Sequence, residues 1–223
     1  MAALFRLVNR GVSMFGIHDL GLFILSGIIF NLAPGPDVIY VLSRGAGHGA
    51  RAGAIAALGI SAGCFVHILA AAIGLSAMLA ASASAFTVIK LIGAAYLVYS
   101  GIMMIAARKK TAGAASPALL PASRSVFLQG FFTNALNPKV ALFFLAFLPQ
   151  FIDKTTPDKA WAFACLGLIL NLTGTTCNLI LAGLAARMAA GFSRATRLRT
   201  IFAKGVGGLF ILLGIKLALA DSS

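Results

Sequence analysis

The apolar positions of this chain form long runs that polar residues interrupt at few places, and this pattern predicts membrane-spanning helices. Each run is about as long as the roughly 20 apolar residues that a helix needs to cross a bilayer. No segment alternates as a β-barrel strand would. We therefore predict an all-α integral membrane protein, one domain over residues 1–223, with six spans at about 19–42, 52–80, 86–107, 126–151, 160–189 and 201–220.

Composition and charge agree with a membrane protein. Hydrophobic residues make up 60% of the 223 residues and charged residues 10%, against about 25% charged in a typical soluble domain. The net charge of +13 comes from basic residues between the apolar runs, as in cytoplasmic loops. We expect a lipid bilayer as partner and no nucleic acid. The cysteines have no CxxC or metal-ligand spacing, so we expect packing residues, no metal site and no cofactor.

A linker at about 108–125 divides the chain into two similar halves, repeat 1 at about 16–107 and repeat 2 at about 126–220. A lysine followed three residues later by a glycine occurs in the third span and again in the sixth. A glycine, asparagine and proline pattern occurs in the first span and in the fourth, at Gly27, Asn31 and Pro34 and at Gly130, Asn134 and Pro138. Because each half has three spans, the second half must enter the membrane inverted.

The loop charges predict the same inversion. The loop between the first two spans carries Arg44 and Arg51, whereas the equivalent loop of the second half balances two lysines with two aspartates. The loop between the second and third spans has no charge, whereas its equivalent has three arginines. The positive-inside rule then makes loops 1–2, 3–4 and 5–6 cytoplasmic. Both termini would lie outside, although Arg6 and Arg10 run against this assignment.

Helix-breaking residues lie near the centres of the first and fourth spans. The first break is Pro34-Gly35-Pro36-Asp37, and the second is Asn137-Pro138-Lys139. Broken backbone is tolerated in a bilayer only where protein buries it or where it lines a water-filled cavity. Freed amides could hold a carboxylate there, and freed carbonyls an ammonium. Inverted repeats with broken helices are typical of secondary transporters, so we predict a polar solute site between the breaks.

Asp37 and Lys139 are the last residues of the two breaks and are the main candidates for chemistry. Pro36 suits the first position of a new half-helix, which would put Asp37 at its positively polarised N-terminus. An ionisable residue inside a membrane is a functional-site hypothesis by default. Asp37 could bind a substrate ammonium, carry a coupling proton, or do both, and a helix cap is the structural alternative. Lys139 could pair with Asp37 or bind a substrate carboxylate.

Three further polar residues lie near the breaks or in the second span. Asn31 and Asn134 precede the breaks, where each could cap loosened backbone or touch substrate. His67 lies near the middle of the second span. It could relay protons, since histidine titrates near neutral pH, or pack as a neutral hydrogen-bonded residue.

The fifth span and two glycines complete the candidates. Asn171, Thr175 and Asn178 fall on one helix face, which suits either a cavity wall or hydrogen bonds between helices. Gly59 and Gly63 predict close helix packing. The phenylalanines of the fourth span are expected to pack or anchor it, namely Phe143, Phe144, Phe147 and Phe151.

Several of these segments form an ordered set along the chain. They are Asn31-Leu-Ala-Pro34-Gly35-Pro36-Asp37, Gly59…Gly63…His67…Gly74-Leu75, Lys90-Leu-Ile-Gly93-Ala-Ala-Tyr96-Leu97, Asn137-Pro138-Lys139 and Phe144-Leu-Ala-Phe-Leu-Pro149-Gln150-Phe151. From about Met14 to Lys216 the chain resembles the LysE/RhtB family of amino-acid exporters. The resemblance implies a six-helix carrier of the bacterial inner membrane that expels amino acids or close derivatives, driven by the proton gradient. It does not say which amino acid is exported. It also leaves the oligomeric state open, and a homodimer is one possibility.

The resulting interpretation is an alternating-access antiporter, not an enzyme, in which substrate ammonium and proton exclude each other at Asp37. An exporter of metal or other inorganic ions would need several carboxylate, histidine or cysteine ligands, and only Asp37 and His67 lie near mid-depth. A transmembrane thiol-redox carrier would need two cysteines that can pair, and Cys64 has no obvious partner. An intramembrane hydrolase would need a paired aspartate, a Ser–His dyad or a metal motif.

Overall fold

The computed structural model describes residues 15–75, 122–153 and 155–189, together with isolated residues between 88 and 102 and between 208 and 215. These ranges cover the first, second, fourth and fifth predicted spans. The third and sixth spans, most of the linker, Lys90 and Arg6 with Arg10 lie outside the described residues. The count of six spans and the inverted repeat therefore stay predictions.

The first predicted span consists of two helices separated by the expected break. α2 runs over Leu20–Leu32 and α3 begins at Pro36, so residues 33–35 leave helical geometry. The break follows from proline chemistry, because Pro34 has no amide hydrogen to donate to the carbonyl group of Phe30, four residues earlier. Pro36 lies in the first turn of α3 and Asp37 follows it. The predicted start of the new half-helix is confirmed.

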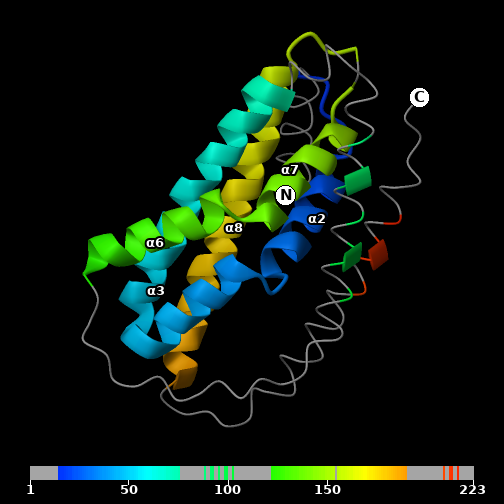
Figure 1. Ribbon diagram of the computed structural model, residues 1–223. Helices are drawn as coiled ribbons and strands as arrows, with labels where there is room; N and C mark the ends of the chain where they lie inside the picture. Colours follow the sequence, from blue (N-terminus) through cyan, green and yellow to red (C-terminus); the bar gives the residue numbers. More distant parts are fainter. Residues whose placement is uncertain are drawn as a thin grey trace, which may run out of the picture.

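α3 extends over Pro36–Ala70 and contains the turn between the first two predicted spans. Its one non-helical residue is Gly49, with φ 85° and ψ 172°, a conformation that favours glycine. The chain reverses there (Figure 1). A π-helical turn, Ala71–Leu75, follows the helix. The boundaries at 42 and 52 are therefore corrected, because Arg44 and Arg51 both lie in helix, on either side of the turn. The predicted end of the second span at 80 lies outside the described residues.

The fourth predicted span is also broken. α6 covers Ser123–Ala135 and α7 covers Pro138–Ala146, and the chain bends by 44° between them. α6 thus begins three residues before the predicted start at 126. Pro138 starts α7 as Pro36 starts α3. By its place in the helix, Pro138 corresponds to Pro36, whereas the sequence pattern paired it with Pro34.

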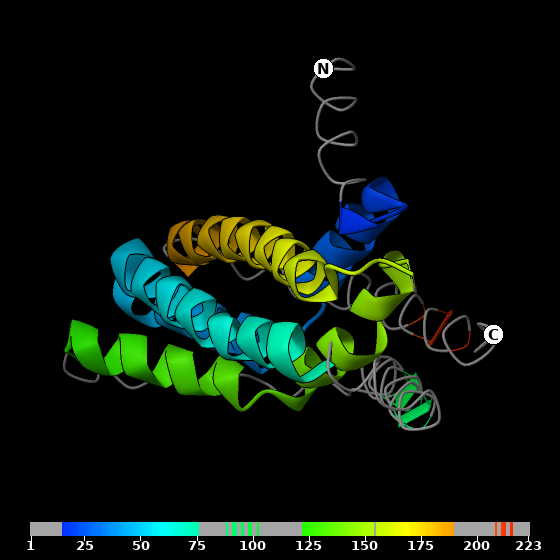
Figure 2. The same cartoon turned by 90° about the horizontal axis from the view of Figure 1, so that it is seen from above.

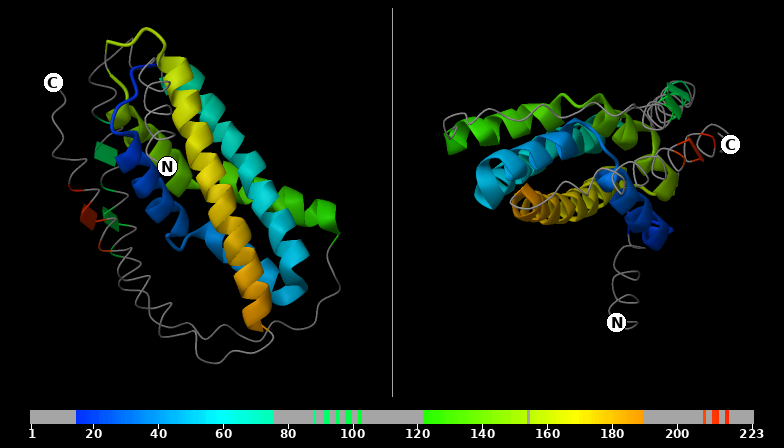
Figure 3. Two further views of the ribbon diagram at one scale, coloured as in Figure 1. Left: turned by 180° about the vertical axis from the view of Figure 1, so that it is seen from behind. Right: turned by 90° about the horizontal axis from the view of Figure 1, so that it is seen from below.

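α8, over Lys159–Ala189, is one continuous helix and agrees with the fifth predicted span. α3 contacts both α6 and α8 and lies between them (Figure 2), while α2 packs against α8. The turn of α3 and the C-terminal end of α8 lie at the same end of the described structure (Figure 3). At the other end, a single antiparallel bridge joins Ile17 to Ile152.

Length and composition of the described helices suit a membrane. Pro36–Gly74 and Lys159–Met188 are each long and apolar enough to cross a bilayer, and Ser123–Ala135 with Pro138–Phe151 could form one further bent span. The first of these ranges includes the reversal at Gly49. The described part of the chain is helical apart from short turns. It contains no strand, only the isolated bridge between Ile17 and Ile152.

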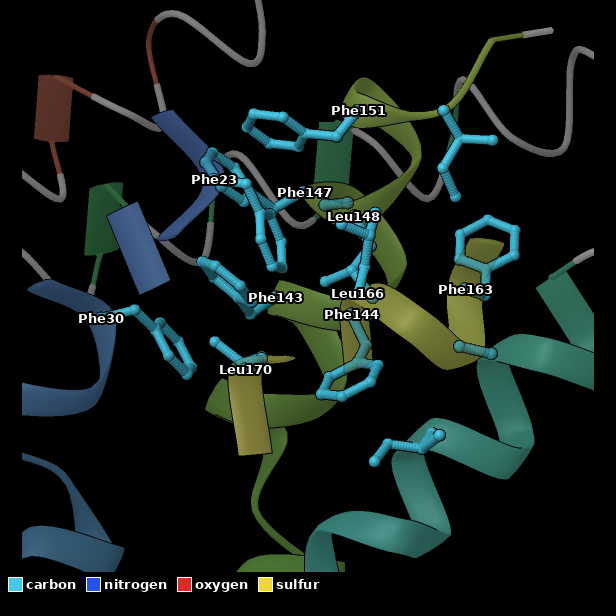
Figure 4. Packing of buried hydrophobic residues seen from close by; sticks show 14 of the residues in the cluster. Phe23, Phe30, Phe143, Phe144, Phe147, Leu148, Phe151, Phe163, Leu166 and Leu170 are labelled. Carbon is cyan, nitrogen blue, oxygen red and sulfur yellow. The ribbon is translucent and has the colours of Figure 1, made fainter. Parts of the chain in front are cut away.

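Aromatic side chains fill the space where α2, α7 and α8 meet (Figure 4). Phe30 of α2 stacks on Phe143 of α7 with 3.9 Å between ring centroids. The predicted packing of the fourth-span phenylalanines is confirmed, since all four are buried. The labelled members of the cluster are Phe23, Phe30, Phe143, Phe144, Phe147, Leu148, Phe151, Phe163, Leu166 and Leu170.

Glycines bring the second half of α3 into backbone contact with α6. A Cβ atom on Gly59 would overlap the carbonyl oxygen of Phe127, and one on Gly63 would overlap that of Phe131. From the other side, a Cβ on Gly130 would lie 2.7 Å from the carbonyl oxygen of Ala56. The predicted close packing is confirmed, and it holds the end of α6 against α3.

Candidate functional site

The two breaks open onto one small cavity between α2, α3, α6, α7 and α8. Its volume is about 40 Å³, enough for about three water molecules at about 10–15 Å³ each. Ligand pockets usually begin near about 300 Å³, so the cavity must widen to hold a whole small metabolite. Predicted site residues that line it are Asn31, Gly35, Asp37, Asn134, Asn137, Lys139, Asn171, Thr175 and Asn178. Pro34, Pro36, Pro138 and His67 lie beside it rather than on its wall.

Asp37 reaches from the start of α3 to the end of α6. Its Oδ2 accepts a hydrogen bond from Asn134 Nδ2 at 2.8 Å. Its Oδ1 is buried and has no hydrogen-bond partner in the described structure. The N-cap of α3 is Gly35, which has no side-chain hydrogen bond. The carboxylate therefore does not act as a cap and presents one oxygen atom to the cavity.

Lys139 makes the corresponding contact in the opposite direction, from the start of α7 to the end of α2. Its Nζ donates to the carbonyl oxygens of Phe30 at 3.0 Å and Ala33 at 2.9 Å, and it lies 4.4 Å from the centroid of the Phe30 ring. Gly35 leaves room for this side chain, because a Cβ there would lie 3.2 Å from Lys139 Cδ. The lysine charge is also close enough to act on Asp37. Asp37 thus bonds the end of α6, and Lys139 bonds the end of α2.

Asn137 caps a helix, whereas Asn31 and Asn134, for which capping was one alternative, do not. The Oδ1 of Asn137 accepts from the backbone amide of Lys139 at 3.0 Å, so it is the N-cap of α7. Asn31 Nδ2 instead donates to the carbonyl oxygen of Leu170 at 3.3 Å, and Asn134 bonds Asp37. The capping alternative for Asn31 and Asn134 was therefore wrong. The signal was available, because asparagine before a helix-starting proline is a favoured N-cap.

His67 supports the end of α6 from outside the cavity wall. Its Nε2 lies 2.9 Å from the backbone carbonyl oxygen of Asn134, which can only accept, so Nε2 donates. The ring is buried and packs against Phe144 at 5.8 Å between centroids. This geometry favours a packing histidine over a proton relay.

The predicted polar face of α8 lies on the cavity, but its members differ in their bonding. Asn171 is bonded on both sides to Ser61 of α3, its Oδ1 accepting from Oγ and its Nδ2 donating to the carbonyl oxygen, each at 3.2 Å. Thr175 Oγ1 donates to the Asn171 carbonyl oxygen at 2.7 Å. Asn178 is buried, and its Oδ1 has no partner in the described structure. Asn171 thus joins α8 to α3, Thr175 bonds within α8, and Asn178 lines the cavity.

The described residues also bear on the metal-ion and thiol-redox alternatives. Within the described residues, no group of three His, Cys, Asp or Glu side chains could hold a metal ion. Cys64 is buried and lines the cavity. It is a free thiol, as are Cys165 and Cys177.

Residues 28–221 match the model of a protein family described as LysE type translocator. The chain belongs to the LysE family. This LysE-family chain is 34% identical over 213 residues to an uncharacterized membrane protein of Pseudomonas aeruginosa, covering 93% of this chain and 98% of the relative. It is 32% identical over 205 residues to a homoserine/homoserine lactone efflux protein of Salmonella typhi, covering 89% and 95%. It is 27% identical over 158 residues to a leucine efflux protein of Salmonella choleraesuis, covering 71% and 74%.

The family match confirms the resemblance drawn from the sequence motifs. The chain is a membrane protein of a translocator family and is not an enzyme. No solved structure matches the LysE-family chain.

Proposed function

We propose that this chain is a secondary active exporter of amino acids or close derivatives, coupled to proton entry by alternating access. The names of two relatives, a homoserine/homoserine lactone efflux protein and a leucine efflux protein, support the substrate class. The observation that carries the proposal is the cavity between the two helix breaks, where Asp37 keeps one buried oxygen without a partner. We place the carrier in the bacterial inner membrane, with loops 1–2, 3–4 and 5–6 in the cytoplasm.

The exchange of substrate and proton takes place at the Asp37 carboxylate. A cytoplasmic amino acid enters when the cavity widens, and its ammonium donates to Oδ1 of the charged carboxylate. A proton arriving from outside neutralises Asp37 and weakens that contact. Because one carboxylate cannot hold both, each ligand favours the state that has released the other.

The inverted arrangement of the two halves explains how the cavity opens alternately. Asp37 bonds the end of α6 and Lys139 bonds the end of α2, so both contacts cross between repeat 1 and repeat 2. Rocking one repeat against the other would open the cavity first to one side and then to the other, as in carriers built from inverted repeats.

Purified protein in liposomes tests the proposal. A panel of labelled amino acids, including leucine, homoserine, threonine and lysine, is offered with an imposed pH gradient. We expect the gradient to drive at least one of them, and Asp37→Asn to abolish the dependence on pH. Asp153→Asn, which alters an exposed carboxylate near the Ile17–Ile152 bridge, is the matched control.

Two results would refute the proposal. If no amino acid responds to the gradient while a divalent metal ion does, the substrate class is wrong. If Asp37→Asn transports at the wild-type rate with an unchanged pH profile, Asp37 is not the coupling residue.

A further inference from the structure

Four buried polar atoms on the cavity wall make no close hydrogen bond in the described structure, and three of them lie beside the two helix breaks. The three are Asp37 Oδ1, Asn134 Oδ1 and Asn137 Nδ2, and the fourth is Asn178 Oδ1 on α8. Asn134 and Asn137 are only 3% and 2% exposed. Buried polar groups without a partner are rare in native structures and unfavourable, so their clustering on one cavity points to a ligand with matching groups.

The chemical identity of each free atom follows from the bonds on its other side. Asn134 donates to Asp37 Oδ2, and a carboxylate only accepts, so the nitrogen faces Asp37 and the oxygen is free. Asn137 accepts from the backbone amide of Lys139, so its oxygen faces the helix and its nitrogen is free. Beside the two breaks, the cavity therefore offers two acceptors, one of them charged, and one neutral donor.

The geometry points to a subsite for an α-ammonium group together with the carbonyl oxygen beside it. The ammonium donates to Asp37 Oδ1 and Asn134 Oδ1, and Asn137 Nδ2 donates to the carbonyl oxygen. The Asn137 side chain also acts on the Asp37 carboxylate as a weak hydrogen-bond donor, so the two groups are adjacent and one small head group can reach both. The volume of about 40 Å³ suits that head and no side chain. The assignment rests on the proposed function and specifies which part of the substrate the cavity recognises.

The donor that meets the carbonyl oxygen is neutral, and this sets the specificity. Two of the three N–H donors of Lys139 are already bonded to Phe30 and Ala33. The uncharged Asn137 amide can donate to a carboxylate, a carboxamide or a lactone carbonyl, and the bond to the carboxylate is the strongest of the three. The cavity should therefore accept uncharged derivatives of an amino acid that keep its ammonium and carbonyl oxygen. It should discriminate against molecules that lack either group, because binding them leaves a buried polar atom unpaired.

Competition in proteoliposomes tests this assignment at about pH 6.5, where α-ammonium groups are charged. The competitors are derived from the panel amino acid that moves fastest. For leucine they are leucinamide, 3-methylbutylamine and N-acetylleucine. We expect the amide to compete within about tenfold of the amino acid, and the amine about tenfold more weakly than the amide for loss of one hydrogen bond. N-acetylleucine, which has no ammonium, should not compete.

Asn137→Ser isolates the proposed donor, because serine keeps an N-cap acceptor and removes Nδ2. The advantage of the amide over the amine should fall by about threefold to tenfold. Asn171→Ser is the matched control, since that asparagine lines the same cavity with its amide bonded on both sides to Ser61. The ratio of amide to amine should not change in that variant.

Several outcomes would overturn the assignment while the proposed export stands. They are an amide that does not compete, an amine that competes as well as the amide, or an equal change of the ratio in both variants. The order of the competitors on the unaltered protein decides the matter even if a variant does not fold. If no panel amino acid moves at all, the proposed function fails and this assignment fails with it.

Discussion

Replacing Lys139 by methionine should destabilise the protein strongly, because its ammonium satisfies carbonyl groups that the break in α2 exposes. Methionine has a similar length and no charge. The substitution leaves the carbonyl oxygens of Phe30 and Ala33 without the bonds of 3.0 and 2.9 Å that they now accept. The Phe30 oxygen keeps a hydrogen bond from the backbone amide of Ala33 at 3.2 Å. The main loss is therefore at the Ala33 oxygen, and losing the partner of a buried polar group costs about 1–3 kcal/mol. The cation–π contact with Phe30 adds to the loss.

The expected loss converts into a measurable change of melting temperature. In a protein of this size, 1 kcal/mol corresponds to about 2–4 °C, so a loss of about 2 kcal/mol should lower Tm by roughly 4–8 °C. The measurement is thermal unfolding of the detergent-purified protein, followed by circular dichroism of the helix band. Lys159→Met is the control, because that half-buried lysine donates to a single carbonyl oxygen, that of Thr156, at 3.0 Å.

The same experiment measures the coupling between the two charges of the cavity. Lys139 acts on the Asp37 carboxylate, so removing the lysine alone also leaves that charge without its neighbour. The double variant Asp37→Asn with Lys139→Met should be more stable than the sum of the single losses predicts, by about 0.5–3 kcal/mol. Strict additivity would show that the two charges do not interact. A Lys139→Met protein as stable as the Lys159→Met control would refute the reasoning about the exposed carbonyl groups.

Three further predictions concern packing, capping and thiols. Gly63→Ala should lower stability by about 1–3 kcal/mol or more, because its Cβ would overlap the Phe131 carbonyl oxygen; Gly183→Ala, in open space, should leave Tm unchanged, and equal Tm values would contradict the packing argument. Asn137→Ala should cost about 1 kcal/mol through loss of the α7 cap, and Asn137→Ser should restore most of it in the same melting assay. Replacing all three cysteines by alanine should leave gradient-driven transport intact, and its loss in a folded protein would favour a thiol-redox carrier.

The two helix breaks could be predicted from the sequence because their cause is local. Pro36 and Pro138 each start a helix for the same reasons wherever they occur, namely a missing amide hydrogen and a fixed φ angle. Placement of Asp37 and Lys139 directly after these prolines then follows from the residue order. That both line one cavity was also expected, because buried charges in a membrane protein face the protein interior.

The partners of these residues could not be predicted, because they depend on how distant helices cross. Asn31 and Asn134 occupy similar places in the two halves, yet one bonds α8 and the other bonds Asp37. A glycine at 174 permits the first contact, since a Cβ there would lie 2.8 Å from Asn31 Oδ1. The reversal at Gly49 was placed only roughly, because the glycines around it are compatible with helix as well as turn.

The hydrogen bonds of Asp37 and Lys139 indicate which of these two contacts breaks at the lower cost in free energy when the cavity opens. Lys139 donates to two carbonyl oxygens at the end of α2. The Phe30 oxygen keeps a backbone hydrogen bond from Ala33, so moving the lysine away would cost mainly the bond that the Ala33 oxygen accepts. Asp37 accepts one side-chain hydrogen bond through Oδ2 and keeps Oδ1 free. A substrate ammonium or a proton can replace the lost contact at Asp37 but cannot replace the donor that the Ala33 carbonyl group needs. Ligand binding can therefore compensate for breaking the contact of Asp37 with α6. We expect that contact to be replaced during transport, while the contact of Lys139 with α2 persists.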